Sequence, residues 1–228
     1  MEHKLQKTYD LSAGRQGARN TVLRNTYWLL ALSMIPTVLG AAIGVTFGVP
    51  MPRGFMGALL FLGVAFGFIW AIEKNKNSGV GVALLLGFTF FMGLMLTPLL
   101  QRTLGFTNGG TLIMLAFGGT ASIFGVLASI ATVSKRDFSG VAKFAFVGLV
   151  LIILASLANI FFQIPALTLT ISVLAIGIFS AFLLYVVQRI ANGGETNYIS
   201  ATLAVYLDVY NIFTSLLQIL GFTSGSRE

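Results

Sequence analysis

The chain has 228 residues and a formal net charge of +7, but only 9% of its residues are charged and 56% are hydrophobic. A soluble domain carries about 25% charged residues, so this composition excludes a soluble globular domain and indicates a polytopic helical membrane protein. Cysteine is absent and the single histidine is His3, which excludes disulfides, thiolate metal sites and a His-centred catalytic triad in the interior.

Residues 1–25 form a polar segment that lacks the basic, apolar and small-residue succession of a signal peptide. We expect a flexible cytoplasmic tail that fixes the orientation of the chain; the alternative is a handle that a partner protein grips. The basic residues that would meet such a partner are Lys4, Lys7, Arg15 and Arg19.

Seven apolar stretches follow, each about the 20 residues needed to cross ~30 Å of hydrocarbon. The sequence therefore predicts an all-α bundle of seven transmembrane helices over residues 26–222, with a short C-terminal tail at 223–228. The stretches lie near 27–48, 54–72, 79–100, 111–133, 144–163, 167–188 and 199–220. Pro165 separates the fifth from the sixth and disfavours a continuous helix, so we expect a tight helical hairpin; two half-spans entering from one side are the alternative.

Lysine and arginine are distributed unevenly over the connections. Eleven lie in the N-terminal segment and at 73–78, 134–143 and 189–198, whereas three lie on the other side, at Arg53, Arg102 and Arg227. The positive-inside rule predicts a cytoplasmic N-terminus and a C-terminus on the opposite side of the membrane. Basic residues scattered over short loops form no phosphate-binding face, so we expect no nucleic-acid partner.

Small residues recur at helix-packing spacing. Gly40, Gly44 and Gly48 share a face of the first stretch, and Gly63 and Gly67 share a face of the second. Such faces let helix backbones approach closely where water supplies no driving force. We expect helix packing at all five positions, with a pore lining as the alternative.

The last stretch carries Asp208, the only carboxylate deep inside a hydrophobic segment. Asn211, Ser215 and Gln218 follow at spacings that place all four on one helix face. An ionised Asp in hydrocarbon is costly and faces a bundle interior or a wet cavity, and removal from water favours its protonated form. We predict a gate or proton relay; the alternative is a neutral Asp that bonds Asn211 or a neighbouring helix.

Other polar side chains lie near the ends of the stretches or beside Asp208. Asn159 and Gln163 are candidates for lining the same interior, or equally for bonding between helices. Tyr206 and Tyr210 flank Asp208 without sharing its face, and we expect them to pack toward lipid or the membrane interface.

The connection before the last stretch is also polar. Gln188 and Arg189 precede Asn192-Gly193-Gly194, a sequence typical of a C-cap turn. Glu195 is expected to complement the N-terminus of the last helix. In the alternative role, it pairs with Arg189 at the cytoplasmic mouth of a path.

Signatures of soluble enzymes are missing. The sequence has no GxxxxGK[ST] phosphate loop around residues 118–120, no HExxH and no GxSxG. Every lysine lies in the tail, in a connection or at the end of a stretch, so a buried Ser–Lys pair is also missing. We expect neither enzymatic activity nor a cofactor.

Five segments resemble the YccA branch of the Bax inhibitor family. They are residues 23–27 (LRNTY), 117–121 (FGGTA), 159–167 (NIFFQIPAL), 193–199 (GGETNYI) and 210–222 (YNIFTSLLQILGF). The specific part is the block from GGETNY to ILGF. The resemblance implies a seven-helix fold with a central last helix, in the inner membrane of a bacterium.

The resemblance also implies two functions. The wider family is described as pH-sensitive calcium leak channels, gated by paired aspartates on the sixth and seventh helices. Asp208 matches the seventh-helix aspartate, but Val186 stands at the sixth-helix position and cannot ionise. The YccA-type proteins are instead partners of the membrane protease FtsH, which they inhibit or modulate and which takes hold of their cytoplasmic tail.

The missing second acid favours the protease-partner function, because a pair that shares protons needs two interacting carboxylates. We therefore expect a modulator, and a possible substrate, of FtsH, with residues 1–25 as the contact segment. The alternative is a calcium or proton-linked leak channel, with Ca²⁺ as the permeant ion and Asp208 as the gate; Asn211, Gln218 and Glu195 would lie along its path. A scaffold with inert polar contacts is the third hypothesis.

Overall fold

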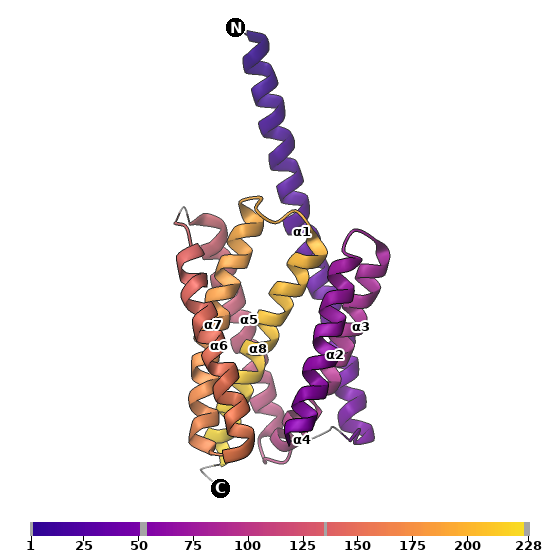
Figure 1. The fold of residues 1–228 in the computed structure, drawn as a ribbon, viewed down its shortest axis with the longest axis vertical. Helices are drawn as coiled ribbons and strands as arrows, with labels where there is room; N and C mark the ends of the chain where they lie inside the picture. Colours follow the sequence, from indigo (N-terminus) through magenta and orange to yellow (C-terminus); the bar gives the residue numbers. More distant parts are fainter. Residues whose placement is uncertain (1, 51–53, 135, 226–228) are drawn as a thin grey trace.

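The computed structural model describes residues 2–50, 54–134 and 136–225, but not the side chains of residues 2–16, 18 and 19. Every regular element in these ranges is a helix (Figure 1), which confirms the all-α prediction. The helices are α1 (Glu2–Phe47), α2 (Gly54–Lys74), α3 (Gly79–Met95), α4 (Thr97–Leu104), α5 (Gly109–Val133), α6 (Ser139–Phe162), α7 (Pro165–Ala191) and α8 (Tyr198–Gly225).

Seven of the described segments are long and apolar enough to cross a membrane, as the sequence predicts. The third is broken into α3 and α4 where the sequence predicts one helix. Pro98 has no N–H to offer the carbonyl oxygen of Leu94, four residues earlier. The hydroxyl of Thr97 donates to that oxygen instead, at 2.6 Å, so the carbonyl is satisfied although the helix is interrupted.

The hairpin between α6 and α7 agrees with the prediction. The two helices have 24 and 27 residues and are therefore about 36 and 40 Å long. Each is long enough to span the membrane alone, so the half-span alternative does not describe them. Gln163 ends α6 in the left-handed region, at φ 52°, and Oδ1 of Asn159 accepts the N–H of Ile164 at 2.9 Å.

Helix α8 occupies the centre of the bundle and contacts α1 to α5 and α7. In Figure 1 it crosses between the α5–α6–α7 side and the α2–α3 side. Its buried apolar side chains form much of the core: Ile199, Ala201, Leu203, Val205, Tyr206, Ile212 and Leu217. The central last helix that the family resemblance implies is thus present.

Glycines bring α1 and α3 into close contact. A Cβ at Gly40 would overlap the backbone oxygen of Phe90, and a Cβ at Gly93 would overlap the backbone oxygen of Thr37. Gly44 similarly leaves room for the side chain of Thr97. Packing is therefore confirmed for the first two glycines of the α1 face.

The remaining three glycines of the two predicted faces do not pack against another described helix of this chain. A Cβ at Gly63 or Gly67 would meet no atom within 4 Å, so the prediction that α2 packs through them is wrong within this chain. Gly48 also has an open surrounding and takes a φ of +60°, at the end of α1, where only glycine turns the chain without strain. Spacing alone identifies a small-residue face but not whether another helix covers it.

The polar N-terminal segment continues α1 beyond the bundle. Helix α1 begins at Glu2 and has 46 residues, a length of about 69 Å, whereas its apolar part begins at Asn20. Figure 1 shows this extension projecting from the end of the bundle opposite the C-terminus. The sequence predicts a flexible tail, whereas the backbone is helical; residues 2–25 contain no proline that would stop the helix.

Candidate functional site

Asp208 lies in the middle of α8 and is 6% exposed. Its Oδ2 is buried without a hydrogen-bond partner, and no hydrogen bond or ion pair links its carboxylate to another residue that the structure describes. A buried polar side chain that joins two helices needs a hydrogen-bond partner. The alternative, in which a neutral Asp208 only forms a structural hydrogen bond to Asn211 or to a neighbouring helix, therefore does not fit this geometry. A buried carboxylate without a protein partner is rare and is commonly functional inside a membrane.

The rest of the predicted stripe does not form one connected site. Nδ2 of Asn211 donates to the carbonyl oxygen of Leu207 on its own helix, at 2.8 Å. Gln218 accepts a hydrogen bond from Ser172 of α7, at 3.2 Å between Oε1 and Oγ. Asp208 and Gln218 are ten residues apart, which is about 15 Å along the helix. The four residues share a face, but no described hydrogen bond links Asp208 to Asn211, Ser215 or Gln218.

The opposite side of α8 corrects the prediction for the two tyrosines. Tyr206 is 1% exposed, and its hydroxyl lies 2.9 Å from Oγ1 of Thr37 on α1. The hydroxyl of Tyr210 donates to the carbonyl oxygen of Met92 on α3, at 3.1 Å. Lipid-facing packing is therefore wrong, because both hydroxyls lie within hydrogen-bonding distance of neighbouring helices of the bundle. The two tyrosines anchor α8 to α1 and α3.

The connection between α7 and α8 forms the predicted turn. Gly193 has a φ of +75°, and the N–H of Gly194 donates to the carbonyl oxygen of Arg189 at 2.8 Å. The predicted ion pair is also present, at 3.2 Å between Arg189 Nη2 and Glu195 Oε2. The mouth of an ion path, which this pair would form, stays a prediction.

Asn197, rather than Glu195, caps α8. Its Oδ1 accepts the N–H groups of Ile199 and Ser200, at 2.9 and 3.1 Å. Glu195 lies two residues before Asn197, and its Oε1 accepts the N–H of Asn197 at 3.0 Å. Asparagine is a preferred N-cap residue, so this role was detectable from the sequence and we missed it.

Two side chains join connections at this end of the bundle. Nδ2 of Asn197 donates to the carbonyl oxygen of Lys76, at 2.9 Å. Gln188 is 4% exposed; it accepts the N–H of Phe138 at 3.0 Å and donates to the carbonyl oxygen of Arg136. The connections at 73–78, 134–143 and 189–198 therefore lie at the same end, as alternating spans require. The side chain of Gln188 is thus hydrogen-bonded to the connection between α5 and α6.

Asp137 lies in that same connection, outside the spans. Its carboxylate accepts the backbone N–H and the hydroxyl of Ser139, at 2.9 and 2.8 Å. These two hydrogen bonds to the charged form lower the pKa of Asp137 below its usual value. The carboxylate thereby provides a hydrogen-bond acceptor for the first N–H group of α6.

A cavity lined by both polar and apolar side chains lies at the opposite end of the bundle. Its volume is about 630 Å³, and it is bounded by α4, the turn between α6 and α7, and the end of α8. Three predicted site residues line it, namely Asn159, Gln163 and Gln218, together with Arg102, which the sequence places only in a connection. Asp208 and Glu195 are not among its lining residues. The structure thus divides the predicted path into a loop cluster, a buried acid and this cavity.

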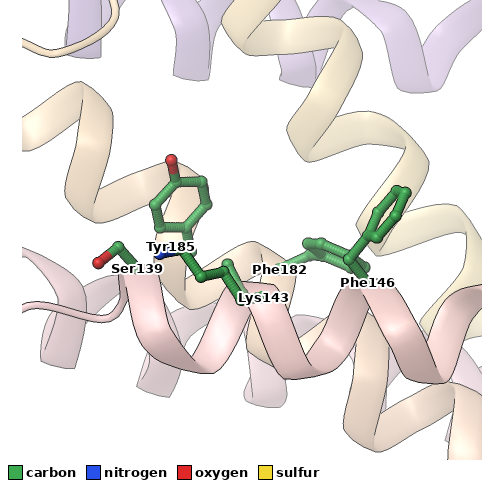
Figure 2. A pocket seen from close by; sticks show the side chains of 6 residues that line it. Ser139, Lys143, Phe146, Phe182 and Tyr185 are labelled. Atoms are coloured by element: carbon green, nitrogen blue, oxygen red, sulfur yellow. The ribbon is translucent and has the colours of Figure 1, made fainter.

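A shallower groove of about 360 Å³ runs between α6 and α7 near the start of α6. Figure 2 shows Phe146 and Phe182 at one end of it, and Ser139 and Tyr185 at the other, with Lys143 between. Its walls are mainly apolar, as expected for helices that face lipid. Among the residues that the structure describes, no group of three or more His, Cys, Asp or Glu side chains could hold a metal ion.

Comparison with known proteins gives one family and several close relatives. The family described as "Inhibitor of apoptosis-promoting Bax1" (Bax1-I) matches residues 19–225. The "Modulator of FtsH protease YccA" of Escherichia coli K12 is 38% identical over 203 residues, which cover 89% of this chain and 90% of that protein. "Uncharacterized protein NMA0420" of Neisseria meningitidis is 38% identical over 229 residues, and "Uncharacterized protein PA2604" of Pseudomonas aeruginosa is 39% identical over 204. These alignments cover 99% and 90% of each pair of chains, respectively.

Proposed function

The chain belongs to the Bax inhibitor family, and from this premise we propose that it modulates an FtsH-type protease in the bacterial inner membrane. The observation that carries the proposal is the 38% identity, over 89% of the chain, to a protein named as a modulator of FtsH. The chain is a multi-pass membrane protein with seven spans, and a relative of the same identity is named an inner membrane protein.

The shape of α1 supports a tail-mediated contact. A helix of about 69 Å is more than twice the ~30 Å that hydrocarbon requires, so its polar end extends well away from the spans. A protease in the same membrane can reach such an extension without opening the bundle. The basic contact residues proposed from the sequence are Lys4, Lys7, Arg15 and Arg19. The structure describes the backbone at these four positions but not their side chains.

The distribution of charge supports a cytoplasmic position for this extension. Eleven of the fourteen Lys and Arg residues lie in the N-terminal segment or in the three connections at its end of the bundle. Positively charged connections are retained on the cytoplasmic side. We propose that the N-terminus is cytoplasmic, where the ATP-dependent part of the protease would meet it, and that the C-terminus is on the other side.

The direct test is co-purification with FtsH, combined with a protease assay on another membrane substrate. We expect FtsH to co-purify with this protein and to degrade the other substrate more slowly in its presence. A seven-span membrane protein from outside the family, added in the same amount, controls for competition by any hydrophobic chain. An unchanged degradation rate, together with no co-purification, would remove the proposal.

A second candidate function is ion conduction, and the carboxylate of Asp208 is the observation that favours it. It is buried and has no partner among the described residues, which suits a group that exchanges a proton or an ion. Two features oppose this function. Val186 stands where the family resemblance calls for a second acid, and α7 contains no Asp or Glu. The proposed path residues Asn159, Gln188, Arg189, Glu195, Asn211 and Gln218 also lie in separate clusters.

Calcium flux into liposomes, measured over a pH series, tests Asp208 as the gate. If the protein conducts, we expect flux that depends on pH in the wild type and not in Asp208→Asn, because amide replacement removes the only carboxylate that lies deep inside a described span; Glu73 lies at the very end of α2. Glu73→Gln is the matched control, since it neutralises an acid at the end of α2 that belongs to no proposed path.

Each outcome separates the hypotheses. Identical pH dependence in wild type and Asp208→Asn argues against Asp208 as gate, and flux in neither protein argues against conduction. The scaffold hypothesis predicts that Asp208→Asn changes neither flux nor the degradation rate measured with FtsH.

A further inference from the structure

The cavity at the C-terminal end of the bundle is formed where several helices end. Pro98 and Arg102 come from α4, Gln163 from the turn after α6, Ser172 from α7, and Gln218 from α8. These residues lie near the ends of spans, at the depth where a bilayer passes from hydrocarbon to headgroups. The volume of about 630 Å³ falls within the range of small-molecule sites, roughly 300 to 1,000 Å³.

The charge of the cavity has one sign. Arg102 is the only charged residue among the described residues that line it. Its guanidinium has no ion pair or hydrogen bond with another residue that the structure describes. The nearest carboxylate along α8 is that of Asp208, about 15 Å below Gln218. An arginine that has no carboxylate neighbour in the described part of the chain favours an anionic ligand over a cation.

Uncharged donors line the same cavity as the arginine. Oε1 of Gln218 already accepts the hydroxyl of Ser172, which leaves the N–H groups of its Nε2 without a described partner. The side chain of Gln163 likewise has no described hydrogen bond. Helix α7 begins at the cavity wall with Pro165 and has no side-chain cap, so N–H groups of its first turn lack intrahelical acceptors. The positive end of that helix adds to the attraction for an anion.

Apolar side chains form the rest of the cavity wall: Leu99, Phe106, Leu169, Leu217 and Phe222. Donors that come from three helix ends suit an oxyanion with several oxygens, and guanidinium groups pair with two phosphate oxygens at once. We propose that this cavity binds a phosphate-bearing ligand, with Arg102, Gln163 and Gln218 as its donors. The phosphate belongs either to a phospholipid, whose glycerol and acyl carbons contact the apolar walls, or to a small soluble phosphate.

The thermal midpoint of the purified full-length protein in detergent tests this site. A ligand that binds only the folded state raises the midpoint, and the rise grows with the ratio of ligand concentration to Kd. One arm adds sodium phosphate against sodium chloride at equal ionic strength, and the other adds dioleoylphosphatidic acid against dioleoylglycerol, which lacks the phosphate. We expect a rise with the phosphate-bearing member of at least one pair, and the pair that responds identifies the source.

Variants of the lining residues test whether the rise in thermal midpoint comes from binding in this cavity. Arg102→Gln and Gln218→Leu are expected to weaken the apparent affinity by about tenfold or more, whereas Arg136→Gln, at the opposite end of the bundle, keeps it. Because Arg102 is exposed, its replacement leaves the packed core intact, and native mass spectrometry reads bound ligand independently of stability. The proposal is overturned if neither pair raises the midpoint, or if Arg136→Gln reduces binding as much as Arg102→Gln.

Discussion

Deletion of residues 2–19 is expected to abolish the effect of this protein on FtsH while the seven-span bundle remains folded. The apolar part of α1 begins at Asn20, so the deletion removes only the extension that projects from the bundle (Figure 1). No span is shortened, and the contacts of α1 with α3 and α8 are kept. The measurement is the degradation rate of a second FtsH substrate with wild-type or truncated protein, together with co-purification.

Two further variants show how the extension acts. A Gly-Ser segment of equal length keeps the reach but removes the sequence, and Gln at Lys4, Lys7, Arg15 and Arg19 keeps the length but removes the charge. If charge makes the contact, the Gln variant behaves like the deletion. If FtsH only needs a free end to grip, both variants stay active.

The deletion also removes four basic residues that help to set orientation, so topology must be checked. The chain contains no cysteine, and a single Ser78→Cys in the exposed connection after α2 is therefore the only labelling site. We expect it to be protected from an impermeant maleimide in intact spheroplasts, with and without the deletion. Full regulation of FtsH by a correctly inserted truncated protein would refute the contact role of the extension.

Gly40→Ala and Gly93→Ala are expected to lower the free energy of unfolding by about 1–3 kcal/mol or more, the usual cost of overpacking. At both positions, the new Cβ would overlap a backbone oxygen of the neighbouring helix. A backbone atom cannot rotate away as a side chain can, so α1 and α3 would have to separate. The measurement is reversible unfolding in mixed micelles with increasing SDS.

Gly63→Ala is the matched control on α2. It adds the same methyl group, but its Cβ meets no atom within 4 Å, and alanine is a better helix former than glycine by about 1 kcal/mol. We expect no loss of stability. A loss at Gly63 equal to that at Gly40 would mean that the small-residue face of α2 is covered by something outside this chain, such as a second copy.

The number and type of elements were predictable from the sequence because hydrocarbon imposes a local requirement. Each span must satisfy its own backbone hydrogen bonds, so length and hydropathy identify it without knowledge of its neighbours. The hairpin at Pro165, the turn at Gly193 and the Arg189–Glu195 pair were predictable for the same reason, since all depend on residues close together in sequence. The break between α3 and α4 also depends on nearby residues, since Pro98 causes it. It was not predicted because Pro98 lies within a long apolar stretch that otherwise fits one helix.

Contacts between distant segments were decided by tertiary structure alone. Helical spacing placed Tyr206 on a different face from Asp208, but only the central position of α8 buries that face against Thr37. The same limit explains why Gly40 and Gly63 look alike in sequence and differ in surroundings. Arg102 joins Gln218 at one cavity although 116 residues separate them in the sequence. A one-dimensional pattern specifies which side chains share a face of a helix, whereas the partner of that face follows from how the seven spans pack together.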